Sequence, residues 1–113
     1  MNYGRGDILL IDLDPTQGSE IKKTRPGVVV SNDVANRFSR LITIVPLTSQ
    51  GTEKIYPQEV LIPKGKGLSF ASKAKVSQIR AVDRSRIKSK LGKVGNFNLK
   101  EIDQALRLHL AIW

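Results

Sequence analysis

The chain has 113 residues, a length that suits one domain, because two halves would each be too small to bury an adequate core. Its 19 Lys and Arg against 10 Asp and Glu give a formal charge of +9, which favours a polyanionic partner such as nucleic acid, an acidic protein or an anionic membrane surface. The lack of cysteine excludes disulfides, thiolate metal sites and a cysteine nucleophile, and the 40% hydrophobic content indicates a globular fold.

The chain begins with Met1–Asp7, which lacks the apolar core of a signal peptide, and no apolar run reaches the ~20 residues of a membrane span. These features predict a soluble, cytoplasmic protein. The first strand is predicted over Ile8–Leu13 and ends at Asp14-Pro15, a dipeptide that favours a turn. The β-branched run Gly27–Val30 predicts the second strand, and a polar loop between two buried strands is a common place for binding and catalytic groups.

Arg25 stands at the end of this loop, directly before the second strand. Pro26 fixes its own φ and biases Arg25 towards an extended conformation, so the guanidinium would be aimed by the sheet. The alternative interpretation is that Arg25 is a solvated loop charge.

The middle of the chain predicts short strands separated by polar turns. Asp33–Ser39 suits one helical turn, and Leu41–Pro46 is a β-branched run expected to end at Pro46, ahead of a polar turn over Leu47–Gly51. Phe70–Ile79 alternates weakly, which predicts a strand with Lys73 and Lys75 on a wet face. The other predictions are a strand at Glu59–Pro63, turns at Lys64–Gly67 and Ala81–Ile87, and a lysine-rich edge strand at Lys88–Val94.

The C-terminal segment is the clearest helix. Asn98 is the expected N-cap, with Glu101 three residues later as in a capping box. Residues at helical spacing are expected to face the sheet, namely Leu99, Ile102, Leu106, Leu110 and Trp113, whereas Leu108 and Ile112 fall on a second face suited to a partner subunit. Short strands with one terminal helix predict a small, strongly curved sheet or barrel closed by that helix.

The composition argues against several kinds of catalysis. One histidine, no cysteine and scattered acids make a metal-hydrolase site improbable, and two-histidine ribonuclease chemistry is excluded by the count. His109 lies among helical leucines, where packing or surface exposure is the simpler interpretation. RNA, however, carries its own nucleophile, the 2′-hydroxyl beside the scissile phosphate. A fixed arginine such as Arg25 can stabilise the phosphorane oxygens, a hydroxyl such as that of Thr48 can donate a hydrogen bond, and a carboxylate such as Glu20 can accept the proton.

Five motifs in this order make the chain resemble the MazF/PemK (Kid) toxins of bacterial toxin–antitoxin systems. The motifs are Gly6-Asp7-Ile8; Asp12-Leu13-Asp14-Pro15-Thr16 with Gly18-Ser19-Glu20; Arg25-Pro26 with Val28-Val29-Val30-Ser31; Val45-Pro46-Leu47-Thr48-Ser49; and Gln78-Ile79-Arg80-Ala81-Val82-Asp83. The similarity covers nearly the whole chain, 1–113, as a single domain.

The resemblance implies a mainly β, SH3-like barrel of the MazF/PemK/CcdB type with a C-terminal α-helix. It implies a homodimeric, sequence-specific endoribonuclease that cleaves single-stranded mRNA without a metal or other cofactor. The products would carry 2′,3′-cyclic phosphate and 5′-hydroxyl ends, and an acidic cognate antitoxin would cover the RNA site.

By motif, the resemblance makes Arg25 and Thr48 the catalytic pair and Glu20 a loop acid implicated in catalysis. Some branches of the family carry an acid at the position of Ser77, so the identity of the general base stays open. The residues expected to bind RNA are Ser19, Lys22, Lys23, Thr24, Ser49, Gln50, Lys75, Ser77 and Gln78.

Two rival functions remain at this stage. CcdB-type gyrase poisons share the barrel and end in a Trp-containing tail, as this chain ends in Ile112-Trp113, and a basic RNA-binding module without activity is the other alternative. The sequence gives neither the recognised RNA bases, nor the antitoxin, nor the order of the loop 15–24 without RNA.

Overall fold

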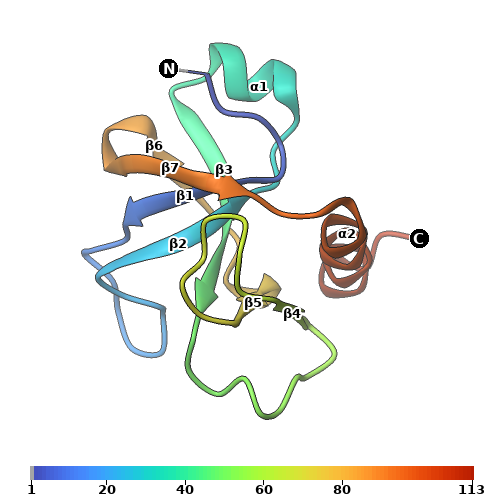
Figure 1. The fold of residues 1–113 in the computed structure, drawn as a ribbon. Helices are drawn as coiled ribbons and strands as arrows, with labels where there is room; N and C mark the ends of the chain where they lie inside the picture. The colour runs from blue at the N-terminus through green and yellow to red at the C-terminus, as the bar shows by residue number, and fades with distance from the viewer. Residues whose placement is uncertain (1) are drawn as a thin grey trace.

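Seven short strands form one antiparallel, strongly curved sheet with a helix against one side (Figure 1). The computed structural model describes residues 2–113. In chain order the elements are β1 (Asp7–Asp12), β2 (Thr24–Val29), α1 (Asp33–Phe38), β3 (Leu41–Thr48), β4 (Glu59–Ile62), β5 (Ser72–Lys75), η1 (Val76–Gln78), β6 (Arg80–Asp83), η2 (Arg84–Arg86), β7 (Ile87–Lys93) and α2 (Asn96–Leu110). The predicted mainly β fold with a C-terminal helix is confirmed.

The long strand β3 organises the sheet because it pairs with three others. Its first half pairs with β6, its centre with β2, and its last two residues, Leu47 and Thr48, with β5. The strand order is β4-β5-β3-β2-β1-β7, and within residues 2–113 no pairing joins β4 to β7. The prediction that the lysine-rich last strand lies at an edge is therefore confirmed.

Backbone packing brings the two ends of the sheet close to each other. Gly67, in the turn after β4, lies against Leu91 and Gly92 of β7 so closely that a Cβ on either glycine would collide with the other segment. Gly67 also has a φ of +103°, which glycine adopts without steric cost. The loop from 63 to 71 is thus fixed to β7.

The side chains of the strands alternate between two buried clusters. One cluster joins the sheet to α2 and includes Val28, Leu47 and Ile102, all fully buried. The other lies on the opposite side and includes Leu9, Val29 and Ile44, again fully buried. Three partly buried side chains, Tyr3, Ile21 and Ile87, pack against this second cluster.

Four predicted boundaries in the strands were wrong. Strand β2 begins at Thr24, so Arg25 lies in a strand rather than in a loop, and β3 runs past Pro46 to Thr48. Pro46 lies between the residues paired with β6 and those paired with β5, where one missing N–H donor is tolerated. The expected strand 70–79 is only β5 followed by η1. Residues 81–83, expected to belong to a turn, lie in β6 because this strand pairs with β3.

The N-terminus of α2 also differs from the prediction. Gly95 is the N-cap and makes no side-chain cap hydrogen bond, so the expected capping box is wrong. Asn98 lies inside the helix, and its Nδ2 donates to Glu101 Oε1 at 3.0 Å.

The apolar faces of α2 follow the prediction only in part. Ile102 is buried as expected, and Leu99 and Leu106 pack against the same cluster. Leu110 and Trp113 are exposed instead. Ala111 has a φ of +55° and ends the helix, so Trp113 lies beyond it and the helical spacing no longer applies to it. Leu108 and Ile112 are 45% and 55% exposed, which leaves the second face available in this single chain.

Lys73 is buried, although the alternation predicted a wet face. Its Nζ donates to Glu59 Oε1 at 2.9 Å, and the two side chains are only 9% and 8% exposed. Glu59 Oε1 also accepts from the Tyr56 N–H at 3.0 Å, and Lys73 Nζ donates to the Lys54 carbonyl at 3.3 Å. Burial raises the pKa of Glu59, but these hydrogen bonds and the positive charges of Lys73 and Lys75 outweigh it and hold that pKa below its ordinary value.

Candidate active site

A cavity opens where β2 and β3 separate. The two strands pair from Val29 and Ile44 down to Gly27 and Pro46, and there the pairing ends. Beyond this point β2 continues beside β1, whereas β3 turns to β5. The divergence leaves Arg25 and Thr48 on strands at either side of an open space.

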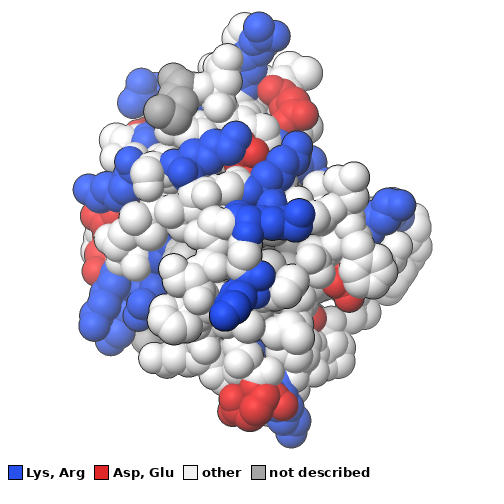
Figure 2. Space-filling model, viewed as in Figure 1, with Lys and Arg blue, Asp and Glu red and all other residues white. Residues whose placement is uncertain are grey.

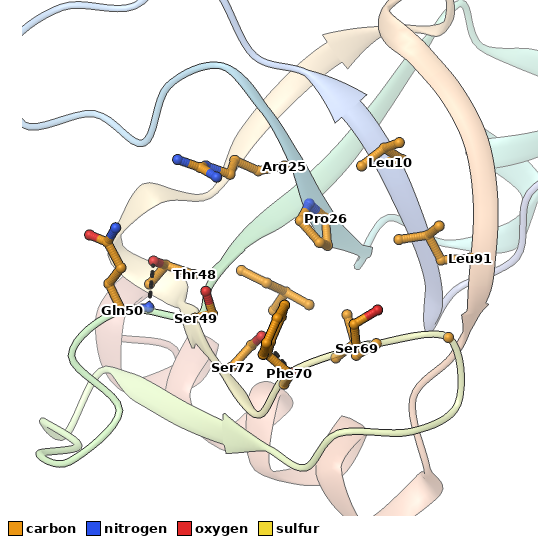
Figure 3. A pocket seen from close by; sticks show the side chains of 13 residues that line it. Leu10, Arg25, Pro26, Thr48, Ser49, Gln50, Ser69, Phe70, Ser72 and Leu91 are labelled. Carbon is orange, nitrogen blue, oxygen red and sulfur yellow. Dashed lines mark hydrogen bonds between the residues drawn. The ribbon is translucent and has the colours of Figure 1, made fainter.

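We call this space the Arg25 cavity, and its volume is about 340 Å³. Figure 3 shows Arg25, Thr48 and Gln50 towards one end, Leu10 and Leu91 towards the other, and Phe70 between them. The full lining is Leu10, Arg25, Pro26, Leu47, Thr48, Ser49, Gln50, Gly67, Leu68, Ser69, Phe70, Ser72 and Leu91. One space therefore combines a cationic, hydroxyl-bearing end with an apolar end.

Arg25 is half-buried, and its guanidinium makes no hydrogen bond or ion pair with any of residues 2–113. Pro26 and the pairing of Arg25 with Ile11 in β1 fix its backbone, so the guanidinium is placed by the sheet. A positioned guanidinium with its donors free is suited to bidentate contact with phosphate oxygens. Arg25 therefore lies on a strand rather than in a loop, and its role in catalysis stays a prediction.

Thr48 supplies a hydroxyl from the last residue of β3. Its Oγ1 accepts a hydrogen bond from the Gln50 N–H at 3.2 Å, drawn as a dashed line in Figure 3. The hydroxyl proton is not engaged by any of residues 2–113 and can be donated to an anion in the cavity.

Glu20 lies in a different hollow, lined by Pro15, Glu20, Ile21, Pro46, Ser77, Gln78, Ile79 and Arg80, which we call the Glu20 hollow. Its Oε1 accepts from the Gln17 N–H at 2.6 Å, so the exposed carboxylate caps a turn of the loop. The structure thus brings Glu20 together with Ser77 and Gln78, while Arg25, Thr48, Ser49 and Gln50 share the Arg25 cavity.

Gln78 fastens the loop 15–24 to the body of the protein. Its Oε1 accepts from the Ile21 N–H at 2.6 Å, and its Nε2 donates to the Ser19 carbonyl at 3.3 Å. A backbone hydrogen bond from Leu13 to Lys23 closes the base of the loop at 2.9 Å. Both the oxygen and the nitrogen of the Gln78 amide therefore hold the loop.

The other residues predicted to bind RNA flank these two hollows. Lys22, Lys23 and Thr24 are exposed at the end of the loop and the start of β2. Lys75 is half-buried, and its Nζ lies 3.8 Å from Glu59 Oε2. Figure 2 shows Lys and Arg side chains spread over the face in view, with Asp and Glu confined to smaller groups.

Sequence reasoning missed several residues of both hollows. Phe70, Ser69 and Ser72 line the Arg25 cavity, although Phe70 was assigned to a strand. Arg80 lines the Glu20 hollow and donates from Nη1 to the Leu13 carbonyl at 3.1 Å. The usable signal for Phe70 was an aromatic ring between Ser69 and Ser72, shortly after the glycine turn 64–67.

The described part of the chain contains neither a metal-binding group of side chains nor a membrane-spanning helix. Within residues 2–113 no three His, Cys, Asp or Glu side chains are grouped so that they could hold a metal ion. None of the helices in the same range is long and apolar enough to cross a membrane.

Comparison with known proteins gives consistent matches over almost the whole chain. Residues 4–110 match the model of the family described as PemK-like, MazF-like toxin of type II toxin–antitoxin system. Endoribonuclease MazF9 of Mycobacterium tuberculosis is 44% identical over 115 residues, which cover 96% of this chain and 97% of that protein.

Solved structures match as well. MazF from Deinococcus radiodurans superposes with a TM-score of 0.86 at 27% identity, covering 99% of each chain. An endoribonuclease from a mycobacterial species, solved in complex with its cognate antitoxin, has a TM-score of 0.81 at 22% identity, covering 98% of this chain and 97% of that one. The second match supports the fold alone.

Proposed function

Because the chain belongs to the PemK-like, MazF-like toxin family of type II toxin–antitoxin systems, we propose that it is an endoribonuclease toxin held in check by a cognate antitoxin. One observation supports placing the active site here. The Arg25 side chain, which has no partner among residues 2–113, lies across one cavity from Thr48. The 44% identity to a named endoribonuclease supports RNA cleavage over gyrase binding and over RNA binding without chemistry.

The proposed reaction uses the substrate's own nucleophile. The 2′-hydroxyl of the nucleotide 5′ to the scissile phosphate gives up its proton to a base, and its oxygen attacks phosphorus to close a 2′,3′-cyclic phosphate. The P–O5′ bond breaks, and the departing 5′-oxygen takes up a proton from solvent water to become the 5′-hydroxyl. Negative charge develops on the non-bridging oxygens, where the Arg25 fork and the Thr48 hydroxyl donate hydrogen bonds. No metal is needed for this sequence of steps, and we propose that none takes part.

Glu20, the candidate general base, lines a different hollow from Arg25 and Thr48. Glu20 can accept the 2′-hydroxyl proton only if its carboxylate leaves the Gln17 N–H and moves from the Glu20 hollow towards the Arg25 cavity. We therefore propose Glu20 as the base on the condition that RNA displaces the loop 15–24. Ser77, in the same hollow, has no acidic group for this task.

The cognate antitoxin is the second expected ligand. We propose that an acidic segment of it covers the same basic surface as RNA, since the chain carries a formal charge of +9 and its family is described as toxins of type II toxin–antitoxin systems. The site of action would be the cytoplasm, where single-stranded mRNA and the antitoxin are both present.

We expect the protein to cleave single-stranded RNA in excess EDTA at the same rate as without it. The reason is that the proposed chemistry needs only the 2′-hydroxyl, Arg25 and Thr48. Analysis of product ends should find 2′,3′-cyclic phosphate and 5′-hydroxyl groups. RNA with a 2′-deoxy sugar at the scissile position is the matched control and should bind without being cut. Inactivation by chelation, or 5′-phosphate products, would contradict the mechanism.

We also propose a homodimer, because the second face of α2 leaves Leu108 45% exposed and Ile112 55% exposed. An isologous contact would cover such side chains. Light scattering at micromolar concentration should give about twice the 12.5 kDa chain mass. Leu108→Asp should raise the dimer dissociation constant at least roughly tenfold, whereas Leu61→Asp, at an equally exposed leucine on β4, should not. A monomer at all concentrations would exclude this arrangement.

A further inference from the structure

We propose that the apolar half of the Arg25 cavity is a nucleobase subsite, in which Phe70 stacks on a base next to the scissile phosphate. The inference rests on the proposed function and adds to it a residue that selects and holds the substrate. Its starting point is a single exposed aromatic side chain inside the cavity that holds the candidate catalytic pair.

Phe70 is 70% exposed, which is unusual for a ring that lines a cavity with apolar walls. In Figure 3 the ring lies between the Arg25 end of the cavity and the leucine end, with Ser69 and Ser72 beside it. A phosphate held by Arg25 would therefore place one of its neighbouring bases over this part of the cavity. The volume of about 340 Å³ is within the ~300–1,000 Å³ of typical small-ligand sites.

The backbone that carries Phe70 is held on both sides, so the ring is presented from a fixed support. On the N-terminal side, Gly67 packs on the backbone of β7, and Gly65 and Leu68 exchange two hydrogen bonds of 2.8 and 2.9 Å. On the C-terminal side, the buried Ser72 hydroxyl donates to the Phe70 carbonyl at 3.1 Å. A stacking platform held in this way loses little conformational freedom when a base binds.

The chemistry of this half of the cavity suits an unpaired base better than another ligand. Its walls are aliphatic, with Leu10 and Leu91 opposite the cationic end, and these cannot satisfy a second phosphate. The exposed hydroxyl of Ser69 lies beside Phe70, where it can meet the edge of a base. Single-stranded RNA is usually recognised by stacking on aromatic rings combined with such edge contacts.

The test uses a short RNA that spans a cleavage site mapped on a long transcript. Phe70→Ala should weaken binding of the uncut 2′-deoxy analogue about 5- to 150-fold, the cost of losing one base stack, and should leave the single-turnover rate at saturation within a few-fold. Phe70→Trp should keep the affinity, because it keeps the ring, whereas Phe70→Leu should behave like Phe70→Ala. Phe97→Ala, at a phenylalanine 74% exposed on α2 and outside the cavity, is the matched control and should change nothing.

An abasic nucleotide identifies the partner of Phe70. With the wild type, removing one of the two bases that flank the scissile phosphate should cost as much affinity as Phe70→Ala, and in Phe70→Ala the same removal should cost almost nothing further. Additive losses at both flanking positions, or wild-type affinity in Phe70→Ala, would overturn the subsite.

Two further results would also overturn the proposal. If Phe70→Ala halved the mass seen by light scattering, the ring would be a subunit contact rather than a stacking platform. If the affinity stayed constant while the saturated rate fell, Phe70 would position catalytic groups instead. A wild type that cuts no RNA at all would instead overturn the proposed function, and the two failures are therefore distinguishable.

Discussion

Replacing Arg25 with alanine should lower the single-turnover rate of RNA cleavage about 100- to 1000-fold, while RNA affinity stays near that of the wild type. The loss corresponds to roughly 3–4 kcal/mol of transition-state stabilisation. The reason is structural: Arg25 lies on β2, paired with Ile11, and has no competing partner among residues 2–113. A donor held in this way acts where charge develops and needs no reorganisation during the reaction.

Three variants separate the roles around Arg25. Arg25→Lys keeps the charge but loses the planar fork, so it should recover only a small part of the rate. Thr48→Ala should lower the rate in the same direction by a smaller factor, and Thr48→Ser should restore it because the hydroxyl remains. Lys22→Ala is the matched control for charge: this exposed lysine should contribute to affinity, with the salt slope reduced by about one, and leave the saturated rate unchanged.

A loss of RNA affinity without a loss of rate would contradict the catalytic role of Arg25. If Arg25→Ala lost affinity and kept the single-turnover rate at saturating RNA, Arg25 would be a binding residue only. Catalysis would then rest on Thr48 and Glu20. Rates and equilibrium binding must be measured on the same RNA and at one salt concentration, because phosphate contacts make both quantities depend on salt.

The second large effect is on stability. Glu59→Gln should lower the free energy of unfolding by roughly 3 kcal/mol, because it leaves the Lys73 ammonium charged and without its counter-ion in a place where it is only 9% exposed. The variant keeps the size of the side chain, and its amide oxygen can still accept from Tyr56, so the change tests the charge. Glu53→Gln, at an exposed glutamate in the preceding loop, should stay within about 0.5 kcal/mol of the wild type.

The difference in unfolding free energy between the wild type and Glu59→Gln should decrease as the pH falls. The pKa of Glu59 is lowered in the folded protein, so the folded state binds fewer protons there than the unfolded state near the ordinary value of 4.5. The stabilisation is therefore complete above that value and is lost as the pH falls through the lower, folded-state pKa. Denaturant unfolding should show the gap between wild type and Glu59→Gln to be largest near neutral pH and to shrink below about pH 4.5. A gap that stayed constant down to pH 3 would exclude the ion pair as its cause.

Local sequence patterns correctly predicted the strands whose own residues are apolar. The runs 8–13, 27–30 and 41–46 are apolar and β-branched, and each lies in or directly beside a strand of the fold. Residues 80–83 were missed because only Val82 of that strand is buried, and its pairing with β3 decides the conformation. Lys73 was missed for a similar reason, since its burial depends on Glu59, fourteen residues earlier.

In the candidate site, too, residues within sequence motifs were found and a residue placed by a long-range contact was missed. Arg25 and Thr48 were found through the motifs around Arg25-Pro26 and Pro46-Leu47-Thr48, and the structure places both at one cavity. Their roles in catalysis remain predictions, as does that of Glu20. Phe70 belongs to the same cavity only because the loop 63–71 packs on β7, and that contact joins residues more than twenty positions apart. Patterns within a short window carry no information about such a contact.

The separation of β2 and β3 beyond Gly27 and Pro46 has a consequence for how the toxin can be controlled. The walls of the cavity are the ends of two strands anchored in the sheet, so its shape is complete once the sheet has formed. An antitoxin would therefore have to inhibit the toxin by covering a cavity that already exists, rather than by preventing the cavity from forming.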